Sequence, residues 1–325
     1  MGISKYVLRR LIEAVITLFI IASLVFVLFR VVPGDPTAAM VDPTFPIEVK
    51  EQIRREYGLD KPVGEQYLRY LANLIRGNLG QSFFYAKPVT EVIGDKIWNT
   101  LILSFASFVV AYAIGLYLGA TTAWKRDSLY ERIMVTVQLV FRSAPLFWTG
   151  MMFLMVFSFR FGWLPHSGMR EPGYPETTLL GKYLSADFLR HLVLPTLTSA
   201  AYYAAMPSML LRNTMLEVMG EDFIEMARAK GLSERRVMYA HAVRNALLPV
   251  VTAAAVYIGL AAGGSTVIEY LFSWPGLGRE IVLAVQRRDY PVAQGAFLLM
   301  GSMVVVMNWL ADIIYGYLDP RVSTT

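Results

Sequence analysis

Long, charge-poor runs of apolar residues are the feature that most constrains this chain of 325 residues. A helix needs about 20 such residues to cross the hydrocarbon core of a bilayer. The runs are Leu11–Val31, Asn99–Ala123, Ile133–Phe159, His191–Leu211, Asn245–Ile268 and Tyr290–Tyr317. With 55% hydrophobic and 17% charged residues, the composition also favours a membrane protein over a soluble domain. The sequence therefore predicts an all-α polytopic membrane protein with six transmembrane helices.

The positions of Lys and Arg predict which side of the membrane each connection faces. Lys5, Arg9 and Arg10 precede the first run, and other basic residues lie between runs two and three, between runs four and five, and after the last. Because Lys and Arg are enriched in cytoplasmic connections, these segments and both termini are expected in the cytoplasm. No small-residue cleavage pattern follows the first run, so we expect an uncleaved first helix.

The side chains present exclude several kinds of chemistry. The chain has no Cys, which excludes disulfides, thiol catalysis and Cys-ligated metals. His166, His191 and His241 lie far apart in the sequence and show no metal-ligand spacing. The net charge of +5 is explained by the basic connections and does not indicate nucleic-acid binding. We therefore expect no catalytic residue, metal site or cofactor in this chain.

A polar insert, residues Arg212–Ala246, separates the fourth and fifth runs. It reads as two short amphipathic pieces hinged at Gly231, and such a charged segment does not cross lipid. One interpretation is that another protein binds this insert on the aqueous side of the membrane. The alternative is that its charges only solvate an inner connection and fix the topology.

The segment between the first two runs predicts a small helical cap. Residues Pro46–Tyr57 and Pro62–Arg76 each begin with proline and are followed by glycine, a pattern typical of helices. An apolar stripe on the second helix favours packing toward the membrane. Whether the cap is structural or contacts a solute directly stays open at this point.

Motifs along the whole chain resemble those of the permease subunits of binding-protein-dependent ABC importers. In and after the insert, Glu225-Met226-Ala227, Gly231 and Leu248-Pro249 are similar to the EAA signature of this family. Other motifs are similar to its dipeptide/oligopeptide branch: Val32-Pro33-Gly34-Asp35-Pro36, Tyr57-Gly58-Leu59-Asp60-Lys61-Pro62, Gly77-Asn78-Leu79-Gly80, Trp274-Pro275-Gly276-Leu277-Gly278 and Leu318-Asp319-Pro320-Arg321.

Two departures from the general family pattern bear on this resemblance. Met226 stands at the middle alanine position of the signature, a replacement that is compatible with a helix. Gly231 and Pro249 are 18 residues apart, which is longer than the general pattern but similar to the peptide branch.

The resemblance implies a type I (MetI-like) permease fold and a division of the chain into parts. Residues 1–31 would form the N-terminal segment and first span, and 32–98 a periplasmic cap. Residues 99–318 would form a five-helix core that contains the insert, and 319–325 a cytoplasmic tail. It also implies a bacterial or archaeal cytoplasmic membrane.

The implied partners are a second homologous permease, two ABC ATPase subunits and an extracytoplasmic solute-binding protein. No G-x-x-x-x-G-K-[ST] loop occurs in this chain, so it lacks that means of binding ATP. ATP and Mg²⁺ are therefore expected on the partner ATPases, and this chain is expected to be a non-catalytic transport subunit.

The residues around Gly231 are the candidates for coupling to the ATPases. A short helix can dock in a groove of a partner, glycine permits a tight turn, and basic side chains can meet acidic groups. The candidates are Glu225, Ala227, Arg228, Ala229, Lys230, Gly231, Arg235 and Arg236.

Arg142 is the candidate for contact with a solute in the passage. It lies inside the third run and is followed by Pro145, which is expected to loosen the helix. A charged residue within a span favours a functional role. The alternatives are a pairing with a neighbouring helix and a side chain that extends toward the cytoplasm.

The outer end of the fifth run carries a second candidate group. Glu269, Trp274, Pro275 and Gly276 are expected to form either an outer gate or a purely structural turn, followed by a short helix that ends at Gln286.

Other functions are weighed against the importer. An ATP-independent channel or secondary carrier would also cross the membrane several times, but the exposed insert argues against it. A membrane enzyme would need converging acid, base or metal-binding residues, and no such cluster is visible. The expected cargo is di- or oligopeptides or similar small solutes. Relatives in this branch also carry oligosaccharides, nickel complexes, glutathione and opines.

Overall fold

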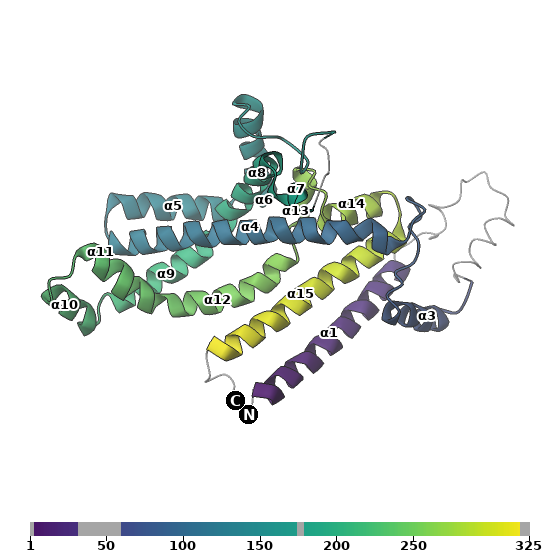
Figure 1. The fold of residues 1–325 in the computed structure, drawn as a ribbon, viewed down its shortest axis with the longest axis horizontal. Helices are drawn as coiled ribbons and strands as arrows, with labels where there is room; N and C mark the ends of the chain where they lie inside the picture. The colour runs from purple at the N-terminus through teal and green to yellow at the C-terminus, as the bar shows by residue number, and fades with distance from the viewer. Residues whose placement is uncertain (1–2, 32–59, 174–178, 319–325) are drawn as a thin grey trace.

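The computed structural model describes residues 3–31, 60–173 and 179–318. These residues form helices joined by turns, and their extended pairing is a single bridge between Gln81 and Pro88. The predicted all-α class is therefore confirmed. Figure 1 shows α10 and α11 at one end of the long helices, here named the insert end, and α3 and α14 toward the other, here named the cap end.

Three of the described helices are long and apolar enough to cross a bilayer: α1 (Ile3–Val31), α4 (Val89–Trp124) and α15 (Tyr290–Leu318). They match the first, second and sixth predicted spans, although α4 begins at Val89 instead of Asn99. The apolar side chains of α1 are largely exposed, as expected for a helix in contact with lipid. The count of six spans stays a prediction, because the other runs are divided between shorter helices.

The third predicted span is broken instead of continuous. α5 (Leu129–Ser143) is followed by α6 (Leu146–Phe153) and a π-helical segment (Leu154–Arg160), and the axis bends by 109° between them. Pro145 is the cause, because the residue before a proline avoids the helical region, and Ala144 is extended at φ −68° and ψ 141°. The loosening expected at Pro145 is a complete break, so the expectation of one continuous third span was wrong.

The fourth and fifth predicted spans are each made of two helices. α8 (Ala186–Tyr203) is followed by α9 (Ala205–Val218), which continues into the polar insert. α12 (Arg244–Ala262) ends before α13 (Thr266–Leu271), and the Ser265 side chain caps α13 by accepting a hydrogen bond from the Ile268 N–H. The insert itself holds α10 (Asp222–Ala229) and α11 (Glu234–Arg236), followed by a π-helical segment (Val237–Val243).

Among the described residues, the shorter helices toward the cap end include α3 (Val63–Ile75), α7 (Leu179–Leu184) and α14 (Leu277–Gln286). α3 confirms the second predicted cap helix, and α14 confirms the short helix that ends at Gln286. The first predicted cap helix, 46–57, lies outside the described residues. Tyr67 of α3 packs against Phe26 of α1 in a tilted arrangement with ring centroids 5.2 Å apart, so α3 is anchored on the end of α1.

α4 is the central helix and approaches α9 closely at two glycines. A Cβ added at Gly115 would lie 2.6 Å from Cγ of Pro207, and one added at Gly119 would lie 2.6 Å from the carbonyl oxygen of Ser208. Small residues at these positions let the two backbones pack directly against each other.

We expect Gly119→Ala to lower the thermal stability of the purified protein, because the new methyl group would push against the α9 backbone. Overpacking of this kind costs about 1–3 kcal/mol. Gly94→Ala is the matched control on the same helix, since a Cβ there meets no atom within 4 Å. Alanine at Gly94 should be neutral or stabilise by about 0.5–1 kcal/mol. Equal unfolding temperatures for the two variants in detergent would contradict this account of the α4–α9 contact.

Candidate functional site

The polar insert is anchored on the ends of the long helices by one face of α10. Ile224 and Ala227, three residues apart, are buried. They belong to an apolar cluster that includes Ala123 of α4, Met215 of α9 and Val250 of α12. Residues at i and i+3 share one side of a helix, so this spacing fixes which face of α10 is turned inward. The insert is therefore packed on three helices and not suspended on loops.

An exposed side of α10, next to the buried one, carries large apolar side chains. Phe223 is 38% exposed and Met226 is 57% exposed, and they follow the same three-residue spacing as the buried pair. In the sequence, Met226 stands out only as a replacement for the middle alanine of the EAA signature, and Phe223 belongs to none of the motifs identified there. Two apolar pairs with the same three-residue spacing, Phe223 with Met226 and Ile224 with Ala227, were the signal, because one short helix of an anchored insert needs only one such pair for packing.

The predicted coupling residues gather at this end, on α10, α11 and the turn between them. Glu225, Ala229, Lys230 and Gly231 are exposed, as are Arg235 and Arg236. Ala227 is the exception, since it forms part of the buried face. The structure thus places most of these side chains where a partner could contact them, while their coupling role stays a prediction.

Arg228 holds the two short helices of the insert together. Its Nε donates to Glu234 Oε1 at 3.2 Å, and its guanidinium lies 5.6 Å from the ring centroid of Trp124 at the end of α4. A cavity of about 190 Å³ lies nearby, with Trp124, Arg235 and Tyr239 among its lining residues. The insert end therefore offers a hollow beside exposed basic and apolar side chains.

Gly231 forms the turn between α10 and α11 in the left-handed region, with φ +76°. Its N–H donates to the Arg228 carbonyl at 2.9 Å, and the Leu232 N–H donates to the Ala227 carbonyl at 3.4 Å. This is the pattern of hydrogen bonds that ends a helix at a glycine. The hinge predicted at Gly231 is confirmed as a tight, defined turn.

Arg142 lies in the last turn of α5, just before the break at Pro145. Its guanidinium lies 4.3 Å from the ring centroid of Tyr202 on α8, so it makes a cation–π contact with a neighbouring helix. The side chain is otherwise exposed. Contact with a solute stays a prediction for this residue.

At the cap end, the buried carboxylate of Glu269 holds the turn that precedes α14. It accepts hydrogen bonds from Thr100 Oγ1 at 2.7 Å and from the Arg279 N–H at 2.9 Å. Gly276 is the N-cap residue of α14, and a Cβ there would lie 2.5 Å from the Glu269 carboxylate. A carboxylate beside the first N–H groups of a helix is stabilised by their orientation.

Trp274 and Pro275 complete the attachment of this turn to α4. The buried Trp274 ring donates from Nε1 to the Asn99 carbonyl at 2.9 Å, and the Asn99 side chain donates from Nδ2 to the Pro275 carbonyl at 2.8 Å. Thr100 Oγ1 also accepts from the Leu277 N–H at 2.8 Å. These contacts describe a firmly held turn, and the gate role of Glu269, Trp274, Pro275 and Gly276 stays a prediction.

Asn99 and Thr100 were not singled out from the sequence, although both are central to this turn. They begin the second predicted span, where a polar pair is ordinarily read as the boundary of the membrane. Their partners lie about 170 positions further along the chain. No spacing rule connects residues this far apart.

A second group of polar contacts ties the start of α4 to the turn after α14. Asp289 accepts from the Ser82 hydroxyl at 2.5 Å and from the Phe83 N–H at 3.1 Å. The Tyr85 hydroxyl donates to Glu280 Oε1 at 3.1 Å. Burial, and after it the negative charge of Glu280, raises the pKa of Tyr85 above its ordinary value. Tyr85 therefore stays a neutral donor at physiological pH.

Comparison with known proteins shows the family to which this chain is similar. Residues 111–324 match the model of the binding-protein-dependent transport system inner membrane component, and residues 3–106 match the N-terminal model of such membrane components. The chain is 39% identical to the di/tripeptide transport system permease protein DppB of Pseudomonas aeruginosa, over 98% of each chain. It is 37% identical to the dipeptide transport system permease protein DppB of Escherichia coli K12, again over 98% of each.

Another relative is named for a different cargo. The glutathione transport system permease protein GsiC of Escherichia coli O6:H1 is 36% identical over 98% of each chain. Among solved structures, an inward-facing MetNI methionine ABC transporter superposes with a TM-score of 0.54 at 19% identity, covering 71% of this chain and 97% of that one. That likeness supports the fold. On the two family models and the full-length relatives, this chain belongs to the family of inner-membrane components of binding-protein-dependent transport systems.

Proposed function

We propose that this chain is the permease subunit of an ATP-driven importer of di- or oligopeptides, and that its polar insert couples it to the ATPases. The single observation that carries the coupling is the two-faced α10, with one face packed on the long helices and the other exposed. Full-length similarity to peptide permeases supports the cargo.

The anchoring of the insert supports the coupling role. A motion applied to the exposed Phe223 and Met226 would be passed through Ile224 and Ala227 to the ends of α4, α9 and α12, because packed side chains transmit displacement. Exposed apolar side chains on α10, together with the exposed Arg235 and Arg236 of α11 in the same insert, match what a partner needs for burial and for electrostatic docking. A solvated connection that only fixed topology would not need large apolar residues on its outward face.

The family implies an ABC ATPase and a solute-binding protein as partners. We further propose that a second, homologous permease forms the other half of the passage, and that two ATPases bind, with ATP and Mg²⁺ held by them. The basic connections support an orientation with the insert and both termini in the cytoplasm. The cap end then faces the solute-binding protein.

The test is reconstitution of the purified complex, with its own partner subunits, in liposomes that contain Mg-ATP or a non-hydrolysable analogue. We expect uptake of labelled dialanine only with hydrolysable ATP and the solute-binding protein. Equal uptake without hydrolysis would overturn the importer in favour of a carrier or channel. ATP-dependent uptake of glutathione but not of dialanine would overturn only the peptide assignment.

A further inference from the structure

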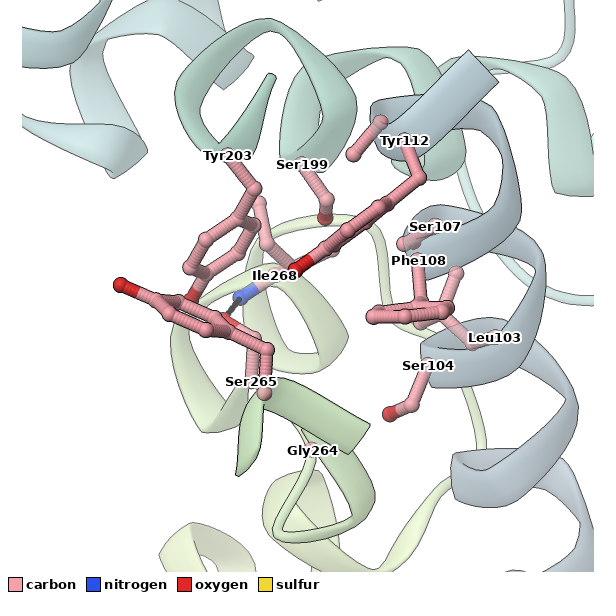
Figure 2. A pocket seen from close by; sticks show the side chains of 12 residues that line it. Leu103, Ser104, Ser107, Phe108, Tyr112, Ser199, Tyr203, Gly264, Ser265 and Ile268 are labelled. Carbon is pink, nitrogen blue, oxygen red and sulfur yellow. Dashed lines mark hydrogen bonds between the residues drawn. The ribbon is translucent and has the colours of Figure 1, made fainter. Parts of the chain in front are cut away.

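A cavity of about 220 Å³ lies between α4, α8, α12 and α13, separate from the insert. Figure 2 shows Ser107 and Tyr112 projecting from α4 on one side and Tyr203 from α8 on another, with Ser265 at the start of α13 closing a third. The break between α12 and α13 brings Ser265 to this place. Three stretches of the chain that are far apart in the sequence, on α4, on α8 and across the α12–α13 break, therefore meet around one space.

The described lining of this cavity combines hydroxyl groups with apolar surface and has no charged side chain. Besides the residues just named, Ser104 and Ser199 add hydroxyls, and Leu103, Phe108, Ala111 and Ile268 add apolar surface. Arg142 is not among the lining residues of this cavity. Its guanidinium lies over the ring of Tyr202, and the ring centroid of Tyr202 is 5.0 Å from that of Tyr203. An uncharged lining of this kind suits groups that form hydrogen bonds without carrying charge.

Two of the hydroxyls in the lining lack a partner within the described structure. Ser107 is 7% exposed, and neither its Oγ nor the Tyr112 hydroxyl makes a hydrogen bond. Two other hydroxyls of the lining are engaged. Ser199 Oγ donates to the Pro195 carbonyl at 3.0 Å, and Ser265 Oγ accepts from the Ile268 N–H at 3.4 Å. A buried polar atom without a partner is costly, so two of them on one cavity indicate that something else binds there.

We propose that this cavity is a solute-contact site of the passage, in which the Ser107 and Tyr112 hydroxyls bond to the uncharged amide groups of a peptide. Peptide amides present the donors and acceptors that hydroxyls match, and the apolar part of the lining contacts small side chains. The cavity is smaller than the roughly 300–1,000 Å³ of pockets that enclose a whole ligand. It therefore takes one part of the solute at a time. This inference rests on the proposed function.

The absence of Cys in the chain allows a direct test. Ser107→Cys would place its single thiol in the cavity, and Thr90→Cys would place one on an exposed site of the same helix, outside the cavity. Both variants are assembled with their partner subunits in liposomes, and a small polar thiol reagent is added during turnover with and without dialanine. Labelling is read from the mass of this chain alone.

The expected result is that saturating dialanine slows the labelling of Ser107→Cys by about fivefold or more and leaves Thr90→Cys unchanged. Undiminished labelling of Ser107→Cys in a complex that still imports dialanine would overturn the contact site alone. Absence of ATP-dependent uptake in the unmodified complex would overturn the proposed function, and the contact site with it.

A second measurement does not depend on labelling. The double variant Ser107→Ala/Tyr112→Phe should lower dialanine uptake by about fivefold or more, as expected for the loss of hydrogen bonds to a solute. ATP hydrolysis stimulated by the binding protein should remain. Thr196→Val is the matched control, because the Thr196 hydroxyl is also buried and without a partner but does not line the cavity. Normal uptake by the double variant would overturn the proposal.

Discussion

Gly231→Glu is expected to abolish ATP-driven uptake while the protein still folds and inserts in the membrane. Gly231 has φ +76°, and a Cβ there would meet no atom of the described residues within 4 Å. The folded chain therefore has room for the side chain, and the left-handed conformation costs only about 1–2 kcal/mol for a residue other than glycine. The large effect would come from a carboxylate and its bulk at the tip of the docking surface beside Phe223 and Met226.

Gly162→Glu is the matched control for this substitution. Gly162 has φ +63°, is exposed and also has no atom within 4 Å of an added Cβ, but it follows the third predicted span and is not part of the insert. Both variants thus carry the same backbone strain and the same charge. We expect uptake, ATP hydrolysis and co-purification of the ATPases to be lost for Gly231→Glu and kept for Gly162→Glu. Normal uptake by both variants would reject the insert as the coupling element.

Glu269→Ala is expected to produce the largest loss of stability among the substitutions considered. The alanine would leave the Thr100 hydroxyl and the Arg279 N–H buried without their acceptor, at about 1–3 kcal/mol for each donor. The turn before α14 would also lose the group that fixes it against α4. We therefore expect a loss of about 3 kcal/mol or more, seen as a lower unfolding temperature in detergent.

Two further variants separate the buried contacts from the loss of a carboxylate as such. Glu65→Ala removes a carboxylate from an exposed i,i+4 pair with Arg69, which is worth only about 0.3–0.5 kcal/mol. Glu269→Gln keeps one acceptor oxygen but turns an amide N–H₂ toward a donor, so an intermediate loss is expected. Equal unfolding temperatures for Glu269→Ala and Glu65→Ala would show that this turn is held by other contacts.

Local patterns explain what could be predicted of the fold and the insert. The apolar runs predicted α1, α4 and α15, because a helix in lipid must satisfy its backbone internally and expose apolar side chains. The Pro-start and Gly-stop pattern predicted α3, and the position of Gly231 predicted the turn after α10. In each case the decisive interactions lie within a few residues along the chain.

The break of the third span shows where local reasoning was insufficient. The sequence predicts that Pro145 disturbs the helix, and the structure has a break there. The 109° bend between the two parts also depends on the packing of α6 against α8 and α13. A proline within an apolar run is compatible with a kinked span or with a complete turn. The neighbouring helices decide between the two outcomes.

The sequence by itself determined the helical class, the membrane-spanning runs and the exposed polar insert with its glycine turn, because these follow from hydropathy, periodicity and backbone preference within short stretches. Only the tertiary structure decided that Thr100 bonds to Glu269, and that the Ser107 and Tyr112 hydroxyls share a cavity without a partner. The physical reason is that hydrogen bonding and burial depend on which distant helices meet, and a single sequence carries no spacing that records this.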